Sequence, residues 1–221
     1  MFWHWITRLG EVQILLPAAL LAAWVLVLRR DSRRTAGIWL LCLGLGIVLT
    51  LVSKLAFMGW GLGLPAFNFS GVSGHAMMAS ALYPMLLATL LPGSCAAGRW
   101  CALGVGAGLA VLVGISRVHV GAHSWSEVIA GLALGGAVTA LVLMAQGLPR
   151  GVPRMSLRTA VGVPLAMAAW LTMMPAFGPA FNSHSMVTQW SLRLSGRPTP
   201  YTRSEMLRDY RQRAAQGAGS A

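Results

Sequence analysis

The 221-residue chain is 56% hydrophobic and only 10% charged, and its formal net charge at pH 7 is +12. Charged residues make up about 25% of ordinary soluble domains, so this composition excludes that class. Several apolar stretches approach the ~20 residues that cross a bilayer, which predicts an all-α integral membrane protein. The arginines cluster between these stretches, as in the RRDSRR segment at 29–34. This is typical of loops that face anionic membrane lipids, and not of a nucleic-acid site.

Six apolar stretches predict six transmembrane helices packed in a bundle. In chain order they are Val12–Leu28, Ala36–Ser53, His75–Leu91, Cys101–Ile115, Ser126–Ala145 and Thr159–Pro175. Together they define a membrane domain over residues 1–178, and its core over 36–145 carries the motifs described below. Residues 179–221 form a polar C-terminal tail that we expect to be partly disordered.

The connections between these stretches alternate in charge. Segments 29–34, 92–100 and 147–158 hold eight arginines, which assigns them to the cytoplasm. Connections 54–74 and 116–122 then face the exterior, as do both termini. The six arginines of the tail oppose this orientation, but they begin well past the last span, where the bias weakens. We therefore expect the polar groups of connections 54–74 and 116–122 to face the periplasm or exterior.

Ionisable residues persist at four span ends, where the bilayer penalises them, and this makes them functional candidates. Lys54 ends the second span, and the turn Ser73-Gly74-His75 opens the third. Ser116-Arg117 ends the fourth span, and His123 with Glu127 opens the fifth. Because the spans alternate in direction, all four places fall on the same face of the membrane.

These residue types suit phosphoryl transfer. His123 and Glu127 are four residues apart and share one face of a helix, so the carboxylate can fix the imidazole tautomer. Arg117 can hold a phosphate bidentately, and Lys54 can add a point charge. Backbone N–H groups at the start of the third span can bind an anion, with His75 placed to pass a proton. The set predicts a phosphate site with a nucleophile and an acid.

The spacing of these residues resembles the phosphatidic acid phosphatase type 2 superfamily, which includes bacterial lipid phosphatases. The family's third motif, Ser-Arg, five residues, His, three residues, Asp, reads SRVHVGAHSWSE at 116–127. The second motif, Pro-Ser-Gly-His, reads VSGH at 72–75. The first motif, Lys, six residues, Arg-Pro, keeps Lys54 but has Gly61-Leu62 in place of Arg-Pro.

The resemblance implies a six-span phosphatase acting on a lipid phosphomonoester or pyrophosphate, without a metal or other cofactor. His123 would attack phosphorus and form a phosphohistidine, Glu127 would orient it, and His75 would protonate the leaving alkoxide. The phosphoryl oxygens would be held by Lys54, Ser73, Gly74 and Arg117. Water would then hydrolyse the phosphoenzyme.

Several alternatives remain open from the sequence. The same phosphohistidine could pass its phosphoryl group to another lipid or a sugar, or the chain could bind or transport lipid phosphates without catalysis. The absent first-motif arginine removes one charge-assisted contact, worth about 1.5–3 kcal/mol; a substitute could come from the tail or not exist. His119 is interpreted as lining the site mouth or as structural, and His184 and the tail arginines as solvated. The oligomeric state is left open.

Overall fold

The computed structural model describes residues 2–28, 32–90, 96–148 and 183–218, and within these ranges the chain is helical and contains no strand. A single bridge, Leu64 to Phe69, closes a loop around the short 3₁₀ helix η2 (Pro65–Phe67). The predicted sixth span, Thr159–Pro175, lies outside the described residues. The all-α prediction is confirmed for the described part of the chain.

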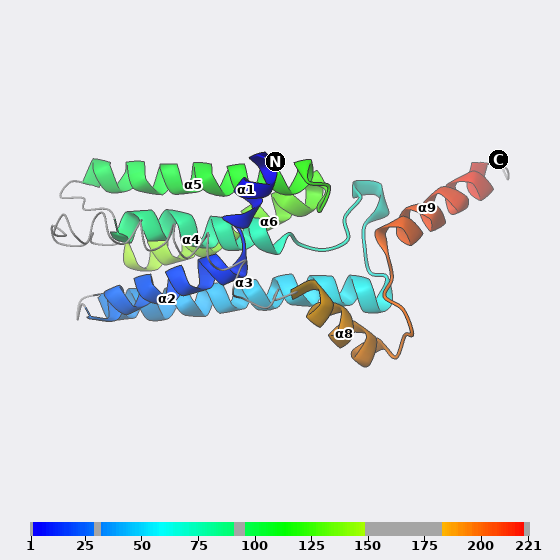
Figure 1. Ribbon diagram of the computed structural model, residues 1–221, viewed down its shortest axis with the longest axis horizontal. Coiled ribbons are helices and arrows are strands. Elements are labelled where there is room, and N and C mark those ends of the chain that lie inside the picture. Colours follow the sequence, from blue (N-terminus) through cyan, green and yellow to red (C-terminus); the bar gives the residue numbers. More distant parts are fainter. Residues whose placement is uncertain (1, 29–31, 91–95, 149–182, 219–221) are drawn as a thin grey trace.

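Most of the helices lie side by side along the long axis of the molecule (Figure 1). In chain order the helices are α1 (Phe2–Arg8), α2 (Val12–Leu28), α3 (Arg33–Trp60), α4 (Gly74–Leu90), α5 (Ala96–His119), α6 (Trp125–Gln146), α8 (Ser183–Ser195) and α9 (Arg203–Ala218). The central helix is α4, which packs against both α5 and α6 and also contacts α2 and α3. At one end of the bundle, α8 packs on α3, and α9 projects away from the other helices.

In the part of the chain that the structure describes, four helical stretches are long and apolar enough to cross a membrane. They are Phe2–Trp24, Arg33–Trp60, Ala96–His119 and Trp125–Gln146. With 17 residues, α4 is somewhat shorter. These apolar helices indicate a membrane-embedded protein, whereas a bundle of six spans stays a prediction.

The second span continues past its predicted end at Ser53 as far as Trp60. Gly61 then ends the helix in the left-handed conformation, with φ +71°, and its backbone N–H donates to the carbonyl of Phe57. Gly59 lies inside the helix because α8 packs there: a Cβ at this position would be 3.2 Å from the Cβ of Ser195. Gly59 therefore serves a close helix contact, and Gly61 serves a helix end.

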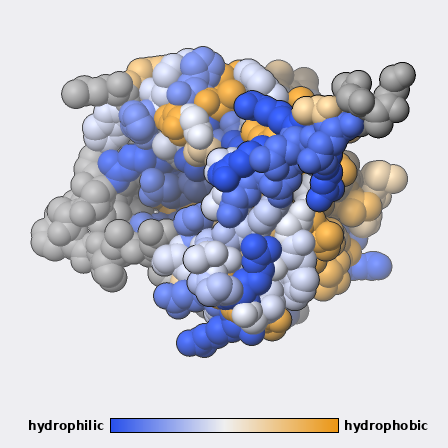
Figure 2. Space-filling model, turned by 90° about the vertical axis from the view of Figure 1, so that its right-hand side faces the viewer, coloured by the Kyte–Doolittle hydropathy of each residue, from blue (hydrophilic) through white to orange (hydrophobic). Residues whose placement is uncertain are grey.

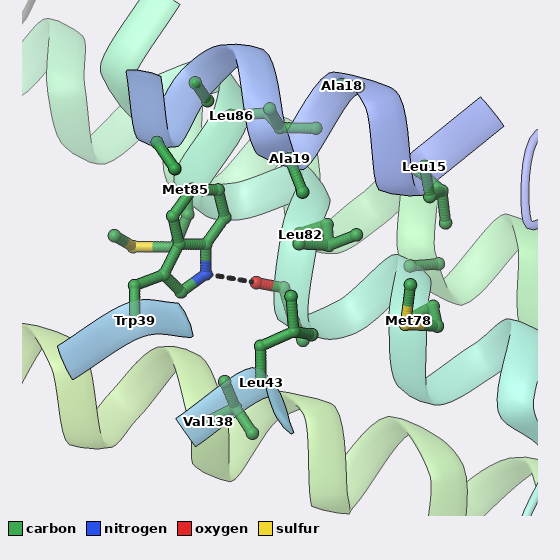
Figure 3. Close-up of a cluster of buried hydrophobic side chains, with 14 of the residues drawn as sticks. Leu15, Ala18, Ala19, Trp39, Leu43, Met78, Leu82, Met85, Leu86 and Val138 are labelled. Atoms are coloured by element: carbon green, nitrogen blue, oxygen red, sulfur yellow. Dashed lines mark hydrogen bonds between the residues drawn. The ribbon is translucent and has the colours of Figure 1, made fainter. Parts of the chain in front are cut away.

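The core packs around Trp39, which is fully buried and donates from Nε1 to the carbonyl of Ala81 over 3.2 Å (Figure 3). Pro84 lies inside α4 and has no N–H to give the carbonyl of Ser80. The hydroxyl of Thr139 on α6 donates to that carbonyl over 2.9 Å instead. Neighbouring helices thus supply the hydrogen bonds that a proline removes in an apolar environment.

The contact between α4 and α6 depends on the absence of a side chain at Gly135. A Cβ there would lie 2.2 Å from the carbonyl oxygen of Met77, whereas a Cβ at Gly136 would meet its nearest atom at 3.6 Å. We expect Gly135→Ala to destabilise the protein by about 1–3 kcal/mol through overpacking, and Gly136→Ala to be neutral or stabilising. Thermal unfolding midpoints in detergent test this pair, and equal midpoints would contradict it.

Candidate active site

A cavity of about 850 Å³ opens at the end of the bundle where α3 and α5 end and α4 and α6 begin. Five of the seven predicted site residues line it: Lys54, Gly74, His75, Arg117 and His123. The other two, Ser73 and Glu127, are fully buried. Hydrophilic residues gather on this end of the molecule (Figure 2). The four span ends singled out in the sequence therefore meet in one place.

His123 lies in the connection between α5 and α6 and is fixed by the first turn of α6. Its Nδ1 lies 2.7 Å from Oε2 of Glu127. Glu127 also forms a capping box with Ser124: the backbone N–H of Ser124 donates to Oε2, and the backbone N–H of Glu127 donates to the hydroxyl of Ser124. Because Nδ1–H is held by the carboxylate, Nε2 is the nitrogen left with a lone pair for chemistry.

The surroundings of His123 favour its neutral form. Burial lowers the pKa of the imidazole below its ordinary value, and the nearby positive charges of Lys54 and Arg117 act in the same direction. The hydrogen bond to Glu127 opposes the shift without reversing it. A neutral imidazole with a free lone pair is the form that can act as a nucleophile.

Glu127 is also bonded to the loop that follows α3 and to the tail. Its Oε1 accepts from the backbone N–H of Ser70 over 2.7 Å and from the Ser70 hydroxyl. Its Oε2 lies 2.6 Å from Nη2 of Arg203, at the start of α9. A fully buried carboxylate is tolerated only when donors surround it, and here those donors come from three separate segments.

Opposite His123, several polar groups could hold an anion. Arg117 donates from Nη1 to the hydroxyl of Thr7 over 2.8 Å, which fixes its side chain against α1. Nε of Arg117 and the hydroxyl of Ser73 are buried and have no hydrogen-bond partner among the described residues. Lys54 approaches the same turn, since a Cβ at Gly74 would lie 3.8 Å from its Nζ. Buried polar groups without partners at the start of α4 fit a site for an anion.

Sequence reasoning missed several residues of this end of the molecule. The cavity is also lined by Glu11, Ser70, His184 and Arg203. The negative charge of Glu11 acts on Arg117. Arg203 and His184 had been interpreted as solvated; for Arg203 this is wrong, since its side chain is only 31% exposed and paired with Glu127. The Thr-x-x-Glu pattern of 202–205 marks a helix start at Arg203, but it does not indicate a contact with Glu127.

His119 does not line the cavity. Its ring stacks on Trp3 at 4.2 Å between centroids, and its Nδ1 lies 3.0 Å from the carbonyl of Ile115. The structure therefore favours a structural role for this histidine, in holding α1 against α5. Across the described ranges, no group of three or more His, Cys, Asp or Glu side chains is arranged to hold a metal ion.

Comparison with known proteins gave two matches to this chain. The family model of the PAP2 superfamily matches residues 56–148. An uncharacterized 22.5 kDa protein in the cps region of Klebsiella pneumoniae is 36% identical over 210 residues, which cover 93% of this chain and 98% of that protein. No solved structure matches the chain significantly. The family match contains His75, Arg117, His123 and Glu127, whereas Arg203 lies outside it.

Proposed function

The protein belongs to the PAP2 superfamily, and from this membership and the geometry of the cavity we propose that it is a membrane lipid phosphatase. The family is one of phosphatase-type proteins, so hydrolysis of a phosphoric ester is the coarse activity. The proposal adds a lipid phosphomonoester or pyrophosphate as substrate and a phosphohistidine intermediate formed without a metal. One observation carries it: a carboxylate-backed His123 and a second histidine, His75, line one cavity with the cations Lys54, Arg117 and Arg203.

In the proposed reaction, Nε2 of His123 attacks phosphorus, and the bond from phosphorus to the ester oxygen breaks. His75 donates a proton to the departing alkoxide, and Lys54, Arg117 and the start of α4 hold the phosphoryl oxygens as their charge rises. A water molecule then attacks the phosphohistidine and gives up a proton to His75. The products are the lipid alcohol and inorganic phosphate, and His123 returns to its neutral form.

The walls of the cavity support a substrate with an apolar part. Besides the histidines, it is lined by apolar side chains of α3 and α4, among them Ile47, Leu51, Met77 and Met78. An apolar wall next to a cluster of polar groups suits an amphiphile whose headgroup must reach the histidines. The arginine distribution supports a site that faces the periplasm from the inner membrane.

The experiment that tests the proposal measures phosphate released by the purified protein in detergent from a panel of lipid phosphates. A chelator is present throughout, and His123→Ala is assayed in parallel. We expect release that resists the chelator and is lost in the variant. Absence of release from every lipid would contradict the hydrolase. Transfer of the phosphate to an added lipid or sugar, without free phosphate, would indicate a phosphotransferase.

The pH dependence of turnover offers a second test. Because the pKa of His123 lies below its ordinary value of about 6.5, the imidazole stays neutral as the pH falls through that value. We therefore expect kcat/KM to hold below pH 6.5 and to fall only when His123 becomes protonated at a lower pH. Substrates with different phosphate pKa values serve as the control. An acid limb of the kcat/KM profile that shifts with the phosphate pKa reports protonation of the substrate and not of His123. An acid limb above pH 6.5 that is independent of substrate would contradict the expectation.

A further inference from the structure

We propose that Arg203 of the C-terminal tail is a phosphate-binding residue of this active site. The inference deepens the proposed function and rests on it for the identity of the reaction, but the binding of phosphate can be measured without turnover. Arg203 would supply the charge-assisted contact that the first motif lacks at Gly61. It lies outside the region matched by the family model.

The position of the guanidinium supports this role. Arg203 lines the same cavity as Lys54, Arg117 and His123, although it is 80 residues beyond His123 in the chain. Its Nη2 lies 2.6 Å from Oε2 of Glu127 and 3.2 Å from the hydroxyl of Ser70. In the described structure both of these bonds use Nη2, which leaves the Nη1 and Nε donors of the planar group for an oxyanion.

The segment before Arg203 packs on the end of α3, and this contact fixes the position of the Arg203 backbone. The backbone N–H of Tyr201 donates to the carbonyl of Met58 over 2.8 Å, and the Tyr201 ring meets that of Phe57 at 5.6 Å between centroids. The hydroxyl of Thr202 accepts from the backbone N–H of Glu205, whose carboxylate accepts from both donors of Thr202. This reciprocal cap begins α9 and holds Arg203 in its first turn.

A second anchor follows one turn later in α9. Met206 is buried, and its Sδ lies 2.7 Å from the position that a Cβ on Gly63 would take. Arg203 is therefore flanked by contacts on both sides: Tyr201, which is hydrogen-bonded to Met58, and Met206, which is buried. A cation held at both flanks loses little conformational entropy when it binds an anion.

The docked tail also occupies the place of the absent first-motif side chain. A Cβ on Gly61 would lie 3.2 Å from the ring of Tyr201, and the backbone of Gly61 has φ +71°, which disfavours an arginine there. The segment whose ring covers position 61 thus brings its own arginine two residues later. The contact between Tyr201 and Gly61 thus both leaves no room for an arginine at position 61 and brings Arg203 to the cavity.

Binding of inorganic phosphate to the full-length protein in detergent, measured by calorimetric titration, tests the proposal. Arg203→Gln retains an N–H donor for the carboxylate of Glu127 but carries no charge. It therefore removes the charge that would bind phosphate while keeping a hydrogen bond to Glu127. We expect it to weaken phosphate binding by roughly ten- to a hundredfold. Arg203→Lys should recover part of the loss, since it keeps the charge but not the planar fork. The matched control is Arg211→Ala, an exposed arginine of the same helix, which should bind like the wild type.

Each result has a definite meaning. Equal phosphate binding by Arg203→Gln and the wild type would overturn the proposal, as would a wild type that binds no phosphate. If Arg203→Gln is less stable than the wild type, the comparison of Arg203→Lys with Arg211→Ala carries the test, and tighter or equal binding by Arg203→Lys would overturn it. A wild type that binds phosphate through Arg203 but releases none from any lipid would refute the proposed function and leave this assignment standing.

Discussion

His123→Ala is expected to lose turnover by at least about 10⁴-fold, because no other group can form the covalent intermediate from the same position. His75 and His184 also line the cavity, but the carboxylate of Glu127 is hydrogen-bonded to Nδ1 of His123. The measurement is kcat for phosphate release from the best lipid substrate. Rapid acid quench with a labelled phosphate should trap a phosphoenzyme in the wild type and none in the variant.

The matched control for this prediction is His119→Ala. His119 lies four residues earlier in the same stretch of chain, but its ring stacks on Trp3 and it does not line the cavity. We expect this variant to keep wild-type turnover, with any effect confined to stability. A His123→Ala protein that turned over at the wild-type rate would refute the phosphohistidine. Loss of activity in both variants with a lower unfolding midpoint would point to folding as the cause.

Glu127→Gln is expected to reduce turnover by roughly 10²- to 10⁴-fold, the range found when the group that orients a catalytic histidine is changed. The substitution has a particular cost here because both carboxylate oxygens accept hydrogen bonds. Oε1 faces the two donors of Ser70, and Oε2 faces donors from His123, Ser124 and Arg203. In either orientation the amide nitrogen of glutamine would point its N–H groups at other donors.

This arrangement adds a stability effect to the loss of activity. A fully buried amide facing donors leaves hydrogen bonds unmade, at about 1–3 kcal/mol for each unsatisfied group. Thermal unfolding in detergent should show this for Glu127→Gln. Glu127→Asp keeps the charge and is one methylene shorter, so it should retain more of both activity and stability. An unfolding midpoint for Glu127→Gln equal to that of the wild type would contradict the bonding described for Oε1 and Oε2.

The convergence of Lys54, Arg117 and His123 could be predicted from the sequence because it follows from counting spans. Once a chain crosses the membrane repeatedly, alternate span ends share a face, and polar residues at those ends must lie near one another. The pairing of His123 with Glu127 was predicted from helical spacing, although in the structure His123 precedes Ser124, the N-cap of α6, and meets Glu127 from outside the helix. These inferences use local periodicity and the bilayer constraint, which act strongly on an apolar chain.

The roles of Ser70, Thr7 and Arg203 could not be predicted in the same way. Ser70 bonds to a residue 57 positions away, and Arg117 bonds to Thr7 across 110 positions. Such contacts depend on the path of loops and termini, which hydropathy does not constrain. The tail was predicted from its polar composition to be partly disordered. In its described part, α8 and α9 occupy most of residues 183–218, Tyr201 bonds to Met58, and Met206 is buried.

The pairing of Arg203 with Glu127 joins residues 76 positions apart, and its bond to Ser70 spans 133 positions. A chain is made from its N-terminus at roughly 5–20 residues per second. His75 and His123 therefore leave the ribosome before Arg203 is added. A nascent chain that has inserted its first spans therefore lacks the guanidinium that pairs with Glu127. We expect the buried carboxylate to complete its set of donors only after synthesis has passed Arg203, so that maturation of this end of the molecule follows membrane insertion.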